Sequence, residues 1–311
     1  MPVDPKVQTI LDAMAAQGGP AFHEVSPEAA RELVRQMQLA GEPEPVEVVA
    51  DRTIPGPAGD IPIRVYTPKG DSPLPVLVFF HGGGWVICDL DTHDSVCRAL
   101  TNAAGCIVVS VDYRLAPEHK FPAAADDAFA ATEWVVEHAV KIGGDPSRVA
   151  VAGDSAGGNL AAVVAQMAKD RGGPRLAFQL MVYPVTDYNF DTASHRENAE
   201  GYMLTTAAMK WFWNHYLPDE KAGLDPQASP LRADDLSGLP PALVITAEFD
   251  PLRDEGEAYA ARLADAGVPA KSTRYDGMIH GFFSMSALLP QGRQAIDEAA
   301  TVLREAFAAV E

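Results

Sequence analysis

One short segment of the chain combines a serine with the small residues that a nucleophile needs around it. Gly153-Asp154-Ser155-Ala156-Gly157 follows an apolar run at residues 149–152 and precedes a helical pattern from Gly158 to Lys169. Between a strand and a helix, a G-x-S-x-G sequence places its serine on a strained turn, where glycines avoid side-chain collisions. The amino end of the following helix stabilises developing negative charge. We therefore predict that Ser155 is a nucleophile. The alternative is an ordinary glycine-rich turn that exposes a serine.

A second glycine-rich segment supplies the donors that such a nucleophile requires. His81-Gly82-Gly83-Gly84-Trp85 follows the apolar run Val76–Phe80. Serine attack on a carbonyl carbon creates an oxyanion, which needs N–H donors already aimed at it. We expect these donors to be the amides of Gly83, Gly84 and Ala156, while His81 braces the loop. A phosphate-binding loop is the alternative reading, but it would lead into Gly-Lys-Ser or Gly-Lys-Thr, and neither follows here.

A general base and an acid must lie after the serine, in the order serine, acid, histidine. Of the eight histidines, His280 fits, because it comes just beyond a predicted last strand at Lys271–Tyr275. Asp250 is the favoured acid, because it leaves another predicted strand and the next residue, a proline, suits the first position of a helix. Glu248 and Asp254 remain alternatives. The acid would fix the imidazole tautomer without taking the proton.

The elements that must position these residues follow a regular rhythm. Short strands, apolar on both faces, alternate with helical stretches, which indicates a parallel sheet covered by helices on both sides. A hairpin of two strands precedes them, with its turn between residues 55 and 60, and an amphipathic helix at Gln291–Val310 closes the chain. The predicted strands are Val46–Ile54, Ile61–Tyr66, Val76–Phe80, Ile107–Val111, Val149–Ala152, Phe178–Val182, Leu243–Thr246 and Lys271–Tyr275.

Two helical regions lie outside this rhythm and are expected to form a cap. The first runs from Pro2 to Gly41, where Ser26-Pro27-Glu28 opens a second helix that includes Met37. The second is an aromatic-rich insertion at Val185–Leu239, too long for a simple connection. The predicted division is therefore a cap part at residues 1–45, a catalytic domain at 46–184 and 240–311, and a cap insertion at 185–239.

Composition and charge exclude several kinds of partner. The chain has 311 residues and a net charge of -19, which repels nucleic acids and anionic membrane surfaces. No apolar run approaches the length of a membrane helix, and the amino terminus lacks the pattern of a secretory signal, so we expect a cytoplasmic protein. The three cysteines are expected to be buried free thiols.

Charged residues outside these motifs are given structural roles. In the Asp112–Glu118 segment, Arg114 is expected to pair with its acidic neighbours. The adjacent acids Asp126-Asp127 and Asp234-Asp235 are expected to form solvated faces, and no metal site is predicted.

Five motifs together resemble the hormone-sensitive-lipase-like carboxylesterases of bacteria and archaea. They occur in order from about residue 40 to the end: His81–Trp85, Asp112–Glu118, Gly153–Gly157, Asp250–Asp254 and His280-Gly281-Phe282. The resemblance implies an α/β-hydrolase fold, an α/β class with a mostly parallel eight-stranded sheet and a helical cap. It also implies hydrolysis of short- to medium-chain carboxylic esters through an acyl-enzyme, without a cofactor, and makes a homodimer an expectation.

Substrate groups must project from Ser155 toward the cap. Trp85, Leu204, Phe212 and Trp213 are the predicted wall, and the resemblance together with a pocket of ordinary size predicts an optimum of roughly four to eight acyl carbons. Two alternatives remain: an amide-cleaving enzyme resembling aryl formamidase, and a ligand-binding protein that keeps the fold without turnover.

Overall fold

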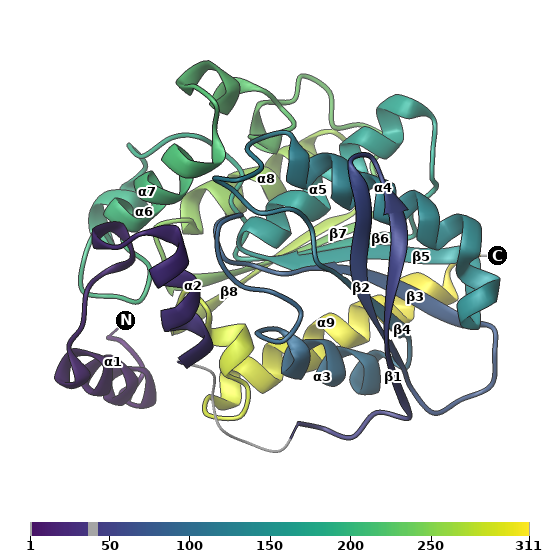
Figure 1. Ribbon diagram of the computed structural model, residues 1–311, viewed down its shortest axis with the longest axis horizontal. Helices are drawn as coiled ribbons and strands as arrows, with labels where there is room; N and C mark the ends of the chain where they lie inside the picture. The colour runs from purple at the N-terminus through teal and green to yellow at the C-terminus, as the bar shows by residue number, and fades with distance from the viewer. Residues whose placement is uncertain (1, 37–42, 311) are drawn as a thin grey trace.

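The computed structural model describes residues 2–36 and 43–310, and its strands form one sheet. The eight strands stand in the order β1-β2-β4-β3-β5-β6-β7-β8 (Figure 1). Strands β2 and β4 pair antiparallel, as do β1 and β2, and every pair from β4 to β8 is parallel. The bounds are β1 Val48–Gly56, β2 Gly59–Thr67, β3 Leu74–Phe80, β4 Ile107–Val111, β5 Gly144–Asp154, β6 Phe178–Val182, β7 Ala242–Phe249 and β8 Ala270–Ile279. The predicted mostly parallel eight-stranded sheet is confirmed.

The amino-terminal hairpin is tighter than the sequence predicts. Its strands continue until Gly56 lies opposite Gly59, so that only residues 57 and 58 form the turn. The two proline residues at positions 55 and 57 favoured a longer loop. Gly59 adopts a φ of 136°, which is readily available to glycine, and this conformation allows the close reversal.

Helices cover both faces of the sheet, as predicted. On one face lie α4 (Ala123–His138), α5 (Ala156–Arg171) and α8 (Arg253–Asp265), and on the other α3 (Asp94–Ala104) and α9 (Pro290–Ala308) (Figure 1). Successive residues of a strand point to opposite faces. In β3, Val76 and Val78 accordingly enter the first core, and Leu77 and Phe79 enter the second.

The remaining helices belong to the amino-terminal region and to the 185–239 insertion. The first region contains α1 (Pro5–Gln17), η1 (Phe22–Glu24) and α2 (Pro27–Gln36), and the insertion contains α6 (Ala193–Glu197), α7 (Thr206–Tyr216), η3 (Glu220–Leu224) and η4 (Pro230–Arg232). The short helices η2 (Ala139–Ile142) and η5 (Phe282–Met285) lie elsewhere.

The two regions touch each other. The rings of Phe22 in η1 and Phe212 in α7 are 6.2 Å apart. Met37 and Gly41, which the sequence included in the helical pattern, lie outside the described residues. The division into domains at residues 45, 184 and 239 stays a prediction.

One expected ion pair and one expected solvated face are wrong. Arg114 binds Asp127 rather than Asp112 or Glu118, with its Nη2 2.7 Å from Asp127 Oδ1. Because α4 begins at Ala123, Asp127 lies in its second turn and faces back toward the loop, where its side chain is 1% exposed. The other acidic pair is exposed, as predicted: Asp234-Asp235.

The three cysteines are free, as predicted, but the predicted burial is wrong for one of them. Cys97 and Cys106 are buried, whereas Cys88 is partly exposed. In the described part of the chain, no helix is both long and apolar enough to span a bilayer.

Candidate active site

Ser155 lies at the sharp turn between β5 and α5. Its φ of 55° and ψ of -118° are strained for a residue with a side chain. The turn is crowded from behind, because a Cβ at position 157 would overlap the carbonyl of Phe80 and one at position 153 would overlap Gly157. Glycine at both flanks therefore lets the end of β3 pass close to the turn while the serine side chain remains 7% exposed.

The loops after β7 and β8 bring an imidazole and a carboxylate to this serine. His280 Nε2 lies 3.0 Å from Ser155 Oγ, and His280 Nδ1 lies 2.7 Å from Asp250 Oδ2. The backbone N–H of Leu252, at the entry to α8, donates to Asp250 Oδ1 at 2.9 Å. The Asp250 side chain is fully buried, so its orientation is fixed by these two hydrogen bonds.

The two alternative acids point elsewhere. Asp254, in the first turn of α8, accepts a hydrogen bond from the backbone N–H of Ser194 and pairs with Arg253. Glu248 accepts a hydrogen bond from the N–H of Gly277 at 2.7 Å. Of the three carboxylates that the sequence offers after this strand, Asp250 is the one hydrogen-bonded to His280.

The glycine-rich loop after β3 presents unused amides. Gly83 and Gly84 have φ values of 107° and 58°, a region that favours glycine. Within residues 2–36 and 43–310, no hydrogen bond uses the N–H of Gly83, Gly84 or Ala156. The amide of Gly82, in contrast, is occupied, because it donates to Asp154 Oδ1 at 2.9 Å. The three predicted donors thus remain available for an oxyanion.

A second histidine–aspartate pair lies beneath this loop. His93 Nε2 is 3.1 Å from Asp154 Oδ1, and both side chains are under one-tenth exposed. Burial alone would raise the pKa of Asp154, but the neighbouring His93, His280 and His81 outweigh it and hold that pKa below its usual value.

His81 is buried and serves the shape of the loop. Burial, together with the nearby His93, lowers the pKa of His81 to about 4, so its ring is neutral at physiological pH. The ring stacks on Tyr113 at 4.3 Å between centroids, and the Tyr113 hydroxyl donates to the His81 carbonyl at 2.7 Å. These contacts fit the bracing role that the sequence indicates.

The predicted wall residues are all in the interior. Trp85 and Trp213 are 0% and 1% exposed, with ring centroids 4.7 Å apart, and Trp85 stacks on Tyr216 at 4.0 Å. Phe212 lies against the glycine loop, since a Cβ at position 84 would overlap its ring. Leu204 is 8% exposed. Their assignment to substrate binding stays a prediction.

Several residues near the site were missed by the sequence reasoning. The ring of Tyr183 lies 4.5 Å from that of His280, and its position directly after β6, at the same sheet edge, was a usable signal. Asp154 stands inside the serine motif, yet only the structure shows its bond to Gly82. His93 lies outside all of the motifs named above.

Comparisons with known proteins agree with this geometry. A family described as having the alpha/beta hydrolase fold matches residues 77–284. From Mycobacterium tuberculosis, the carboxylic ester hydrolase LipN is 49% identical over 263 residues, covering 82% of this chain and 70% of its own. The carboxylesterase NlhH of the same species is 44% identical over 318 residues, covering 98% of this chain and 96% of its own.

A solved structure of similar sequence has the same architecture. The thermostable esterase from Pseudomonas putida ECU1011 superposes with a TM-score of 0.95 at 46% identity, covering 98% of each chain. Fold, motifs and full-length relatives therefore agree, and the chain belongs to the α/β-hydrolase family, among its hormone-sensitive-lipase-like carboxylesterases.

Proposed function

We propose that this chain is a serine carboxylesterase that hydrolyses short- to medium-chain carboxylic esters through an acyl-enzyme. One observation carries the proposal: an unbroken line of hydrogen bonds from Ser155 Oγ through His280 to Asp250, with distances of 3.0 and 2.7 Å. Nucleophile and base within hydrogen-bond reach, with the base oriented by a third group, is the arrangement that activates a serine.

The acylation step follows from these contacts. Ser155 Oγ attacks the ester carbonyl carbon while His280 Nε2 takes its proton, and the carbonyl π electrons move onto the oxygen. The amides of Gly83, Gly84 and Ala156 stabilise that oxyanion. Collapse re-forms the carbonyl and breaks the bond to the alcohol oxygen, which receives the proton from His280. Asp250 holds the Nδ1 proton of His280 and stabilises the imidazolium while it exists.

Deacylation repeats the sequence with water. His280 takes a proton from a water molecule, whose oxygen attacks the acyl carbon, and returns that proton to Ser155 Oγ as the acid leaves. The helix α5 points its amino end at Ser155, so its dipole favours the negative charge of both tetrahedral intermediates.

The relatives support an ester as the bond that is cleaved. LipN and NlhH are named as a carboxylic ester hydrolase and a carboxylesterase, and a matching chain from Saccharolobus solfataricus is named as an arylesterase. Amide cleavage would use the same residues, so turnover of a p-nitrophenyl ester and of the matched anilide should be compared. The arrangement around Ser155 argues against a ligand-binding protein without turnover. A cytoplasmic location and a homodimer stay predictions.

The wall of the acyl site is also a proposal. Phe212, which touches the oxyanion loop at Gly84, is the best-placed of the four predicted residues. Phe212→Ala should move the optimum toward longer acyl chains if this ring closes the site. A lower melting temperature with the same profile would instead assign Phe212 to the core alone.

Replacement of the serine tests the proposal directly. Ser155→Ala should remove nearly all ester turnover with the fold intact, and a phosphonate inhibitor should label Ser155 in the wild type. The matched control is Ser237→Ala, because Ser237 is exposed and precedes the amino end of β7, at the opposite edge of the sheet. A folded Ser155→Ala variant with a tenth of the activity, or a phosphonate adduct on another serine, would overturn the assignment.

A further inference from the structure

The oxyanion loop is held from outside as well as from within. Inside the loop, the carbonyl of Gly83 accepts hydrogen bonds from the N–H groups of Val86 and Ile87, at 3.0 and 2.9 Å. These bonds close the turn that carries Gly83 and Gly84. These bonds lie within the turn and do not fix it relative to the rest of the molecule. The direction in which the amides of Gly83 and Gly84 point therefore also depends on the contacts of the residues that follow them.

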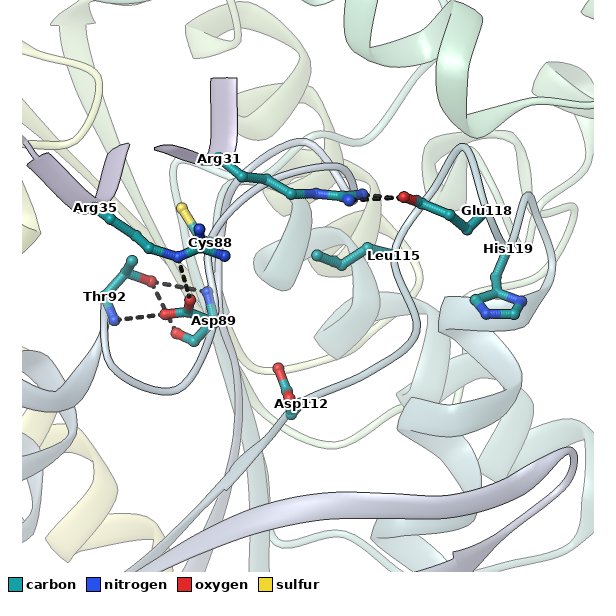
Figure 2. A pocket seen from close by; sticks show the side chains of 9 residues that line it. All are labelled: Arg31, Arg35, Cys88, Asp89, Thr92, Asp112, Leu115, Glu118 and His119. Atoms are coloured by element: carbon teal, nitrogen blue, oxygen red, sulfur yellow. Dashed lines mark hydrogen bonds and ion pairs between the residues drawn. The ribbon is translucent and has the colours of Figure 1, made fainter. Parts of the chain in front are cut away.

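Two groups from outside bind the chain just after Gly84: the N–H of Ala116 donates to the carbonyl of Trp85 at 2.8 Å, and an arginine of the amino-terminal region binds the next carbonyl. Arg31 in α2 donates from Nε to the carbonyl of Val86 at 2.8 Å and from Nη2 to the carbonyl of Ala116 at 2.9 Å. Its two terminal nitrogens also bind both carboxylate oxygens of Glu118, each at 2.7 Å (Figure 2). One guanidinium thus joins the loop after β3 to the loop after β4.

We propose that Arg31 is a positioning residue that keeps the amides of Gly83 and Gly84 aimed at the oxyanion. The inference rests on the proposed ester hydrolysis. It gives the helix α2 a part in stabilising the transition state, because Arg31 belongs to that helix. Donors to an oxyanion act only when they lie at hydrogen-bond distance from its developing charge. A shift of this loop should therefore lower kcat and leave substrate affinity nearly unchanged.

The two kinds of contact made by Arg31 can be separated. A lysine at this position keeps a positive charge for Glu118, but its single nitrogen does not reproduce the planar fork that reaches two carbonyls and a carboxylate together. Glu118→Gln removes the ion pair and leaves both carbonyl contacts. If the carbonyl contacts position the loop, Arg31→Lys must cost more than Glu118→Gln.

The same helix offers a matched control. Arg35, one turn further along α2, lines the same hollow of about 440 Å³ beside the loop (Figure 2). Its Nη1 lies 3.4 Å from Glu32 Oε2 and its Nε lies 3.7 Å from Asp89 Oδ2. It makes no hydrogen bond to Val86 or Ala116. The side chain of Arg31 also lines this hollow and is 18% exposed, so a small cation has access to the space that it occupies.

The experiment compares kcat and KM of four variants on a p-nitrophenyl ester that the wild type hydrolyses. Arg31→Ala should lower kcat about 10- to 100-fold with KM changed by less than about twofold, in the range expected for misplaced oxyanion donors. Arg31→Lys should lose about tenfold, and Glu118→Gln clearly less. Arg35→Ala should match the wild type.

Chemical rescue by a small cation distinguishes positioning from a purely structural role of Arg31, because added guanidinium should raise kcat only in the first case. Millimolar guanidinium should restore part of the kcat of Arg31→Ala, whereas the same concentration of ammonium should not, and neither should raise the activity of Arg35→Ala. Guanidinium restores the planar donors but no helix packing.

The outcomes separate this inference from the function on which it rests. Failure of the wild type to turn over any ester contradicts the proposed function. An active wild type with unchanged kcat in Arg31→Lys, or with equal losses in Arg31→Lys and Glu118→Gln, overturns the positioning role. If Arg31→Ala does not fold, the comparison of Arg31→Lys with Glu118→Gln decides.

Discussion

Two histidine–aspartate pairs flank Ser155, and they are nearly alike in composition and burial. In the first, His280 Nδ1 lies 2.7 Å from Asp250, and its Nε2 lies 3.0 Å from the serine hydroxyl. In the second, His93 Nε2 lies 3.1 Å from Asp154, and its Nδ1 lies 3.0 Å from Thr92 Oγ1. The difference is what the other ring nitrogen contacts: the hydroxyl of Ser155, the proposed nucleophile, in the first pair and the hydroxyl of Thr92 in the second.

The carboxylates differ in the same way. The second oxygen of Asp250 accepts a hydrogen bond from the backbone N–H of Leu252, and this bond fixes the carboxylate itself. Asp154 accepts a hydrogen bond from the N–H of Gly82, and thereby holds the loop that carries the proposed oxyanion donors. A buried histidine–aspartate pair is therefore not in itself a proton-transfer device, and its role follows from the third group that it touches.

Breaking the first pair should have the largest effect. Asp250→Asn should lower kcat on the order of 10⁴-fold, as in the serine-protease triad, because an amide at this position favours the wrong imidazole tautomer. Steady-state kinetics on a p-nitrophenyl ester measure the loss. Asp254→Asn is the matched control and should cost far less. If folded protein shows the reverse order, the acid must be reassigned to Asp254.

Breaking the second pair should cost less, and through a different step. Asp154→Ala removes the acceptor of the Gly82 amide and should lower kcat about 10- to 100-fold through displacement of the oxyanion loop, with little change in KM. Asp154→Asn keeps an oxygen for that amide and should lose less. A loss in Asp154→Ala as large as that in Asp250→Asn would show that the pair takes part in proton transfer, contrary to the comparison.

The pH dependence of folding stability should also reveal the contribution of Asp154. The pKa of Asp154 is lowered in the folded protein, so the unfolded chain binds its proton first as the pH falls. The ion therefore contributes stability above its unfolded pKa of about 3.9, and this contribution is lost as the pH falls through the lower folded value. Melting temperatures of wild type and Asp154→Asn should differ at neutral pH and converge at strongly acid pH. A gap that stays constant down to pH 3 would contradict this account.

The two pairs also differ in whether they could be predicted from the sequence. The mostly parallel sheet, the turn at Ser155 and the meeting of His280 and Asp250 beside it could be predicted, because parallel strands place their carboxyl ends together and each of these residues follows a strand directly. The second pair was not, because the contact between His93 and Asp154 depends on a loop geometry that no sequence spacing encodes. Asp127 was misread for a similar reason, since its partner Arg114 is set by where α4 begins.

The cap was predictable only in outline. Aromatic density indicated a packed insertion, and the structure buries Trp85 and Trp213 against each other. Arg31 gave no signal at all, because an arginine on an amphipathic helix is indistinguishable from a solvated one until its partners are known. Two of its four hydrogen bonds go to backbone carbonyls, which every residue type carries.

A third carboxylate, Asp112, gives the smallest prediction and shows what a buried acid does without an imidazole. It follows β4 at the same edge of the sheet, and among the described residues no hydrogen bond or ion pair reaches its carboxylate. Burial, with the nearby Asp89 and Asp91, raises its pKa to about 6. The folded state therefore holds this proton more tightly than the unfolded chain, and stability falls as the pH rises from about 4 through 6.

Asp112→Asn removes that penalty, so it should stabilise the protein at neutral pH while both carboxylates of the histidine pairs stay intact. The expected gain is about 1 kcal/mol after allowance for solvent screening of a partly exposed group, or a melting temperature higher by about 2 °C. The gain should vanish near pH 4, where wild-type Asp112 is protonated in the folded state. Asp71→Asn, in the exposed loop between β2 and β3, is the control and should change nothing. A loss of stability in Asp112→Asn at neutral pH would mean that this carboxylate, like Asp154 and Asp250, has a partner to stabilise.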